Sequence, residues 1–131
     1  MQLLLDTHAL IWFLENDDRL TDNALRAIRQ AETVFVSPIN FYEMAIKIKI
    51  GRTIGLNRPI GDAIELTQQS GLVWIPLEKQ HLLAYQRIPF FEEHRDPFDR
   101  MLLAIALADD LTILSADQNF PLYADLVPTL W

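Results

Sequence analysis

Four acidic residues, spread along the whole chain, have the types and positions that could do chemistry. They are Asp6, Glu43, Asp99 and Asp117. Carboxylate oxygens are the ligands that hard divalent cations such as Mg²⁺ prefer, usually together with waters and phosphate oxygens. A metal held in this way activates water and stabilises a departing oxygen in phosphodiester cleavage. Whether the four carboxylates can share one site depends on the elements that carry them.

Short apolar runs predict the strands of a buried parallel sheet. They are Gln2–Leu5, Thr33–Val36, Leu72–Ile75 and Leu111–Leu114, with an edge strand near Pro128. Amphipathic runs alternate with them, which is typical of an α/β fold with a mostly parallel sheet. Ligands of such sheets bind outside the carboxyl ends of the strands. Asp6 and Asp117 therefore converge if the first and fourth strands are neighbours.

Cap residues and apolar spacing predict six helices between these strands. They cover Thr7–Leu14, a segment capped by Thr21 or Asp22, Ser37–Pro38 to about Ile50, a segment within Arg58–Gly71, a short one within Glu78–Gln86, and Pro97 to about Asp109. The third of these helices is apolar on nearly all sides apart from Glu43. A lone charge there is costly unless it is paired or bound to a metal.

The stretch His94–Ala108, HRDPFDRMLLAIALA, holds two acids with two possible roles. Asp96 precedes Pro97 and takes the N-cap position, which places Asp99 at the third helical position. A cap is worth about 1 kcal/mol, and this explains both acids when they are viewed alone. It does not explain why four carboxylates map to one sheet edge, where they would repel one another without a cation.

Composition limits the class of protein. The chain has 131 residues, a net charge of −7 and no cysteine, which fits a single domain over residues 1–131 in a reducing, cytoplasmic compartment. No segment reaches the roughly 18 apolar residues of a membrane span. The acidic charge argues against a broad electrostatic grip on nucleic acid, so RNA binding would need cations and a local basic patch.

Four stretches of the chain together resemble a known family. LLLDTHALIWFL, SPINFYEMAIKIKIG, HRDPFDRMLLAIALA and ILSADQNF are similar, in order, to PIN-domain ribonucleases of the VapC type, the toxins of bacterial toxin–antitoxin pairs. The resemblance implies a three-layer α/β/α domain with a five-stranded, mostly parallel sheet. It also implies Mg²⁺- or Mn²⁺-dependent RNA cleavage, a homodimer, and inhibition by a small antitoxin protein.

The resemblance carries the catalytic acids over to Asp6, Glu43, Asp99 and Asp117. We expect Asp6, Asp99 and Asp117 to hold metal, and Glu43 either to bind metal or to act as a base. Thr7 and Ser115 would orient these ligands by hydrogen bonds, and Asp96 could contribute beyond its cap. His8 and His94 lie beside acids, but single histidines more often serve packing or lie at the surface.

Basic residues are few, so their positions matter. Lys47, Lys49 and Arg52 cluster near the end of the Glu43 helix, and Arg95 and Arg100 flank the start of the last helix. Either group could contact RNA phosphates. The alternatives are a solvated helix face for the lysines and carboxylate pairing for the arginines.

Two other functions compete with an RNA-cleaving toxin. One is a different Mg²⁺-dependent phosphoryl-transfer enzyme. A haloacid-dehalogenase-like phosphatase would need an aspartate at position 8, which is His8, and a receiver domain would need one where the third strand ends in Ile75-Pro76. The other is a binding domain that keeps the fold without catalysis, although none of the expected acids is missing.

Overall fold

A five-stranded parallel sheet forms the centre of the computed structural model, which describes all of residues 1–131. The strands are β1 (Gln2–Leu5), β2 (Thr33–Val36), β3 (Val73–Trp74), β4 (Thr112–Leu114) and β5 (Thr129–Leu130), in the order β3-β2-β1-β4-β5. β1 pairs with β2 on one side and with β4 on the other. The strand order therefore reverses at β1, and the carboxyl ends of β1 and β4 lie side by side, which is the condition under which Asp6 and Asp117 converge.

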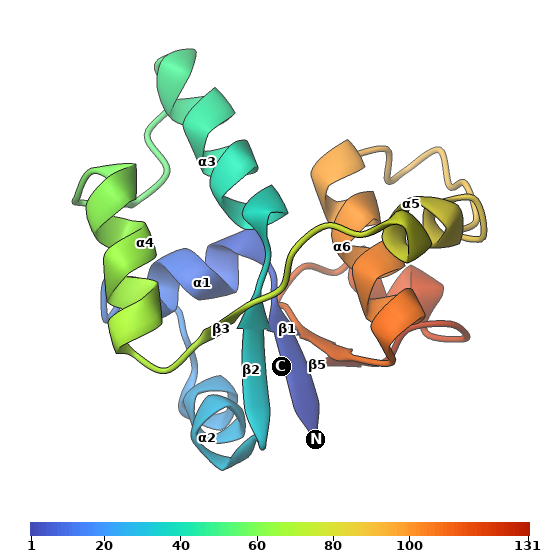
Figure 1. Cartoon of the computed structure of the whole chain (residues 1–131), viewed down its shortest axis with the longest axis horizontal. Coiled ribbons are helices and arrows are strands. Elements are labelled where there is room, and N and C mark those ends of the chain that lie inside the picture. The colour runs from blue at the N-terminus through green and yellow to red at the C-terminus, as the bar shows by residue number, and fades with distance from the viewer.

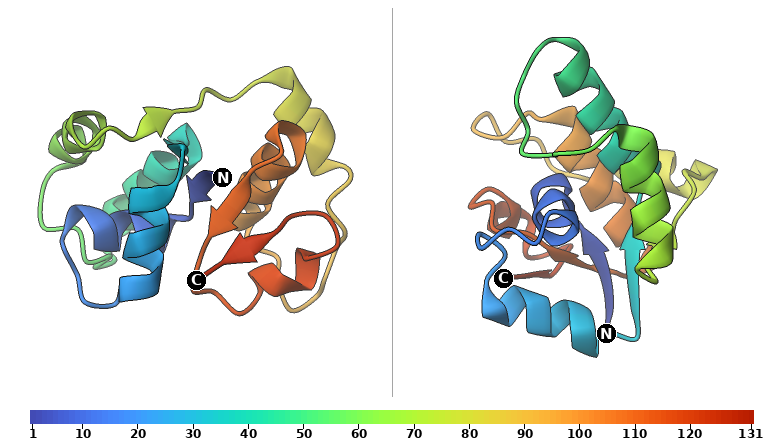
Figure 2. Two further views of the ribbon diagram at one scale, coloured as in Figure 1. Left: turned by 90° about the horizontal axis from the view of Figure 1, so that it is seen from below. Right: turned by 90° about the vertical axis from the view of Figure 1, so that its left-hand side faces the viewer.

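Six helices and one 3-10 turn cover the sheet. They are α1 (Thr7–Leu14), α2 (Asp22–Gln30), α3 (Pro38–Lys49), α4 (Ile60–Gln69), α5 (Lys79–Tyr85), α6 (Pro97–Asp109) and η1 (Phe120–Tyr123). Figure 1 shows α1, α2 and α4 on one side of the strands and α5 and α6 on the other, and Figure 2 shows these layers from two further sides. The three-layer α/β/α fold predicted from the sequence is confirmed.

The side chains of β1 show why its apolar run is continuous. Leu3 and Leu5 enter the core beneath α1, α2 and α4, whereas Leu4 enters the core beneath α5 and α6. All three leucines are fully buried. A central parallel strand is covered on both faces, so both sets of its alternating side chains must be apolar.

The carboxyl edge of the sheet is where three helices meet. α1 and α6 begin there, and α3 starts at the end of β2 and contacts both of them. In Figure 1 this edge lies at the top, away from the N-terminus. Ser37 and Asn40 form a capping box at the start of α3, and Pro38 occupies its first turn. These residue types favour a helix start at this position.

The periphery differs from the sequence prediction in two places. β3 is shorter than the predicted Leu72–Ile75 run, because it is the edge strand and Val73 and Trp74 are exposed. Trp12 and Phe13 of α1 are half-buried and pack against the rim of the core. The η1 turn, which brings in Tyr123, was not predicted. No helix combines the length and apolar character needed to cross a membrane.

Candidate metal centre

Asp6 is fixed where β1 passes into α1. Its backbone N–H donates to the Leu114 carbonyl at 3.2 Å, so the pairing of β1 with β4 extends one residue past the strand. Its Oδ1 caps α1 by accepting the Ala9 N–H at 2.7 Å, and its Oδ2 accepts the Ser115 hydroxyl at 2.5 Å. The side chain is only 3 % exposed. Asp6 is therefore a rigid ligand at the switch point of the sheet.

The turn after β4 positions Asp117 beside Asp6. The Ser115 hydroxyl that donates to Asp6 also accepts the Asp117 N–H at 3.0 Å. Asp117 Oδ1 accepts the Asn119 N–H at 2.8 Å, which leaves its other carboxylate oxygen free. Ser115 therefore hydrogen-bonds to the side chain of Asp6 and to the backbone of Asp117 at once.

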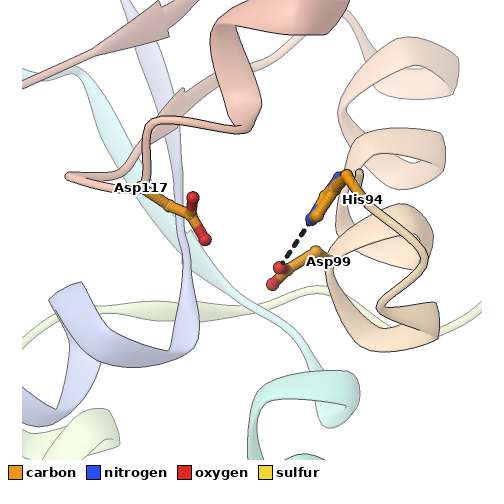
Figure 3. Close-up of side chains that lie close together, drawn as sticks. All are labelled: His94, Asp99 and Asp117. Carbon is orange, nitrogen blue, oxygen red and sulfur yellow. Dashed lines mark hydrogen bonds and ion pairs between the residues drawn. The ribbon is translucent and has the colours of Figure 1, made fainter. Parts of the chain in front are cut away.

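Asp96 and Asp99 divide their roles at the start of α6. Asp96 Oδ1 accepts the N–H groups of Phe98 and Asp99 at 2.8 and 3.1 Å, which confirms it as the N-cap. Asp99 lies one turn inside the helix, and its side chain leaves the helix toward Asp117, as Figure 3 shows. The cap fixes the first turn, and the first turn aims Asp99 at the carboxyl edge.

Glu43 reaches the same edge from α3. Asn40 anchors the start of this helix, since its side-chain amide donates to the Leu5 carbonyl and the Thr7 hydroxyl, each at 3.2 Å. Glu43 is 3 % exposed. Its Oε2 pairs with the Lys47 ammonium, but its Oε1 has no hydrogen-bond partner. A buried carboxylate oxygen without a donor is costly, and a bound cation would satisfy it.

One small cavity joins all of these acids. Its volume is about 80 Å³, and no hydrophobic residue lines it. The lining residues are Asp6, Thr7, His8, Glu43, Lys47, Asp96, Asp99 and Asp117. The structure thus brings together all four acids singled out in the sequence and adds Asp96. We call this space the acidic cavity.

Ionising the carboxylates in the acidic cavity costs free energy. Burial raises the pKa of Asp6 to about 6, against the hydrogen bonds from Ser115 and Ala9. Burial also raises the pKa of Asp99 to about 8, and the charges of Asp96, Glu43, Asp6 and Asp117 raise it further. Only Lys47 supplies a nearby ion pair. A divalent cation removes this repulsion, so the donor set fits a hard metal ion.

His94 supports Asp99 from behind. Its Nε2 lies 2.9 Å from Asp99 Oδ2, and its Nδ1 lies 2.9 Å from the Tyr123 hydroxyl (Figure 3 shows the Asp99 contact). Ligand atoms of His94, Asp99 and Asp117 lie within 4.8 Å of one another. The sequence placed His94 beside the acids, but nothing in it indicated Tyr123, which reaches the histidine only through η1.

The hydrogen bonds around Tyr123 assign the protons on His94. The Arg100 guanidinium donates to the Tyr123 hydroxyl at 3.5 Å, and arginine has no acceptor atom. Tyr123 is buried, so its own proton must go to His94 Nδ1. His94 therefore carries its proton on Nε2 and donates it to Asp99. Burial lowers the pKa of His94, which favours this neutral form.

The basic residues predicted to contact RNA differ in their burial and in their contacts. Arg100 is buried, and it donates to the carbonyl oxygens of Pro89 and Ile88 at 2.8 and 3.1 Å and to the Tyr85 hydroxyl. The prediction that Arg100 contacts RNA is wrong, because its side chain points into the loop before α6. Lys49 and Arg52 are exposed, and Lys47 is half-buried against Glu43.

Fold and site together define an α/β protein with a carboxylate centre at the switch point of a parallel sheet. The family model of the PIN domain matches residues 3–126, and the chain belongs to this family. The predicted PIN-domain membership is confirmed. No curated protein sequence matches the chain significantly.

Solved structures with the same fold span nearly the whole chain. VapBC2 from Rickettsia felis, bound to a promoter DNA fragment, is 14% identical with a TM-score of 0.70, covering 98% of this chain and 97% of that one. VapC20 from Mycobacterium tuberculosis, a sarcin–ricin loop cleaving toxin, is 13% identical with a TM-score of 0.63, covering 92% and 93%. FitAcB from Neisseria gonorrhoeae is 16% identical with a TM-score of 0.60, covering 98% and 96%.

Proposed function

We propose that the chain is a metal-dependent endoribonuclease, the toxin of a toxin–antitoxin pair, acting as one PIN domain over residues 1–131. The observation that carries this proposal is the acidic cavity, in which five carboxylates line about 80 Å³. One oxygen of Glu43 is buried there without any donor. Stability alone gives no reason to gather these charges, whereas a divalent metal would neutralise them.

Asp6, Asp99 and Asp117 would hold Mg²⁺ or Mn²⁺. Each offers a carboxylate oxygen at the acidic cavity, and each belongs to a different segment of the carboxyl edge. When bound, the ion would lower the pKa of a water and stabilise the leaving oxygen of a phosphodiester. The chain supplies the rigidity of this site, because Ser115, Ala9 and His94 hold the ligands in place.

Glu43 would act on the attacking water. Its carboxylate lines the cavity from α3, and its free Oε1 is available to accept a proton or orient a water. The Lys47 ammonium pairs with one oxygen of Glu43 and would face an RNA phosphate from the cavity rim. Lys49 and Arg52 extend this positive charge outward along the end of α3.

RNA, a small antitoxin protein and a second copy of the chain are the proposed partners, in the cytoplasm. The likeness to VapC20, described as a toxin that cleaves the sarcin–ricin loop, supports RNA as the substrate class. The likeness to VapBC and FitAB assemblies supports a bound protein partner. The net charge of −7 would suit an antitoxin segment rich in basic residues.

The test is RNA cleavage with Mg²⁺ or Mn²⁺ and with EDTA, using the wild type, Asp6→Asn and Glu65→Gln. Asparagine keeps the α1 cap but removes the charge, so Asp6→Asn should fold and lose metal-dependent cleavage. Glu65 is exposed on α4, so Glu65→Gln should cleave as the wild type does. Cleavage that persists in EDTA or in Asp6→Asn would contradict the proposal. Metal binding without cleavage of any RNA pool would favour a non-catalytic domain.

A further inference from the structure

A second cavity, of about 250 Å³, adjoins the acidic cavity and differs from it in charge. The two cavities share Thr7, His8 and Lys47. The rest of the second lining is Ile11, Trp12, Arg19, Met44, Arg52, Thr53 and Ile54. It contains no carboxylate, although the chain has 18 acidic and only 11 basic residues. We call this space the basic cavity.

The three cations of the basic cavity are not equally available. Arg19 is held by Asp17, with 2.6 Å between Nη2 and Oδ2, and Lys47 is paired with Glu43. Arg52 is exposed and has neither a hydrogen bond from its side chain nor an ion pair. An arginine with five donors and no partner beside a cluster of carboxylates is suited to a phosphate group.

An aromatic stack lines the basic cavity, and its His8 also lines the acidic cavity. The rings of His8 and Trp12 lie 5.8 Å apart with an interplanar angle of 20°. The Arg19 guanidinium packs on the Trp12 ring at 5.4 Å, which holds the indole in place. His8 is exposed, and no other aromatic ring or guanidinium packs on it. His8 is therefore an exposed ring with one stacking partner, which makes it suited to stack on a flat ligand.

We propose that the basic cavity binds the nucleotide next to the scissile phosphate of a single-stranded RNA. Arg52 and Lys47 contact its phosphate, and its base stacks on His8, which Trp12 and Arg19 hold in place. Stacking on an aromatic ring and pairing of a backbone phosphate with arginine are the two interactions that bind single strands without reading their sequence. The inference rests on the proposed function, since the scissile phosphate would lie in the adjoining acidic cavity.

The first experiment measures RNA binding without cleavage. Fluorescein-labelled octa-adenylate is titrated with the folded chain in Ca²⁺, and binding is followed by fluorescence anisotropy at several salt concentrations. Arg52→Gln should weaken binding about tenfold and reduce the slope of log K against log salt by about 0.7, the value for one lost phosphate contact on a single strand. His8→Ala should weaken binding to a similar extent with an unchanged slope.

Two further variants serve as controls. His8→Phe keeps an aromatic face and should restore most of the affinity lost in His8→Ala. Arg26→Gln changes an equally exposed arginine on α2, at the other end of the strands, and should bind octa-adenylate like the wild type. Equal losses in His8→Phe and His8→Ala, or in Arg26→Gln and Arg52→Gln, would overturn the assignment.

Steady-state cleavage separates this inference from the proposed function. Arg52→Gln and His8→Ala should raise KM about tenfold and leave kcat within about threefold, because they bind the flanking nucleotide in ground and transition states alike. If the wild type cleaves RNA with metal but neither variant changes KM, the basic cavity is not the subsite and the proposed function stands. If the wild type cleaves no RNA yet binds octa-adenylate through Arg52 and His8, the proposed function fails, and the basic cavity is a nucleotide-binding site without a scissile phosphate beside it.

Discussion

Asp99 and Arg100 are neighbours in the first turn of α6, yet they enter two opposite kinds of polar environment. Asp99 faces the acidic cavity, where burial and four other carboxylates raise its pKa to about 8. Arg100 faces the loop before α6, where two carbonyl oxygens and two tyrosine hydroxyls accept its hydrogen bonds. The protein supplies hydrogen-bond partners for the charge of Arg100, but it supplies no positive charge that neutralises the carboxylate of Asp99.

This difference separates a structural polar cluster from a functional one. A buried charge that contributes to folding needs partners for its hydrogen-bonding atoms, because each unpaired atom costs free energy. A metal ligand must instead keep an oxygen lone pair free, and the protein bears that cost until the ion binds. Substitutions on the two sides of α6 should therefore change different properties.

Asp99→Asn should have the largest effect, on catalysis. Removing one metal ligand costs several kcal/mol of transition-state stabilisation, so Mg²⁺-dependent RNA cleavage should fall by about 10³-fold or more. At neutral pH the metal-free variant should be more stable than the wild type, because folding no longer requires Asp99 either to bind a proton or to be buried as a charge beside other carboxylates. Cleavage kinetics and urea unfolding in EDTA measure the two effects.

Asp96→Ser is the matched control in the same turn. Serine also caps helices, so this variant should keep most of the activity and stability of the wild type. If Asp96→Ser lost cleavage and Asp99→Asn kept it, the chemistry would have been assigned to the wrong aspartate.

Arg100→Ala should have the next largest effect, on stability. It leaves the carbonyl oxygens of Ile88 and Pro89 without donors and opens a gap beneath the loop, so the free energy of unfolding should fall by about 3 kcal/mol. Urea unfolding measures this loss. The affinity of the folded variant for Mn²⁺ should fall less than in His94→Ala, because Arg100 reaches Asp99 only through Tyr123 and His94. A loss of Mn²⁺ affinity as large as in His94→Ala, at unchanged stability, would contradict a mainly structural role for Arg100.

His94→Ala should have an intermediate effect on metal binding. Residues that hold a ligand by a hydrogen bond affect metal affinity about 10- to 100-fold, and His94 holds Asp99 in this way. Calorimetric titration with Mn²⁺ measures the change. His81→Ala is the control, because His81 makes a similar bond to Asp109 at the far end of α6. A loss of stability without a loss of Mn²⁺ affinity is expected there, and equal affinity losses in both variants would refute a specific role for His94.

The pH dependence spreads its effect over several pH units, so the change per unit is small, and its sign is diagnostic. The pKa of Asp99 is raised from 3.8 to about 8, so the metal-free fold binds this proton more tightly than the unfolded chain does. Its contribution to stability is fully present below about pH 4 and is lost as the pH rises through about 8. Mn²⁺ must displace the same proton, so its affinity should rise by up to about tenfold per pH unit below pH 8. Asp99→Asn should flatten both curves, and an unchanged slope in that variant would place the proton elsewhere.

Local sequence signals predicted most of the fold. The run Gln2–Leu5, the Ser37-Pro38 start and the Asp96-Pro97 start each gave an element whose bounds the structure reproduces, because strand burial and helix caps depend on neighbouring residues. The edge strand β3 was less well predicted. Its pairing partner lies on one side only, so its length depends on β2 rather than on its own residues.

The sequence predicted which acids form the candidate site but not the hydrogen bonds that hold them. The four acids converge because each belongs to an element that begins or ends at the carboxyl edge. The His94–Tyr123 bond joins residues 29 positions apart through an unpredicted 3-10 turn. For Arg100 the sequence predicted a contact that the structure does not have. An arginine near two aspartates in the sequence is compatible with an exposed RNA-binding position, and only the fold of the loop at Ile88 and Pro89 shows that it is buried.

The sequence by itself determined the strands, the helix caps and the identity of the carboxylates, because backbone preferences and side-chain chemistry are local properties. Only the tertiary structure decided which charges are satisfied. The order β3-β2-β1-β4-β5 places Asp6 beside Ser115, and the packing of α3 and α6 leaves Glu43 Oε1 without a donor. Burial and charge repulsion act through space. An aspartate at position 96 is therefore a helix cap, whereas an aspartate at position 99 is a candidate metal ligand that binds a proton when no metal is present.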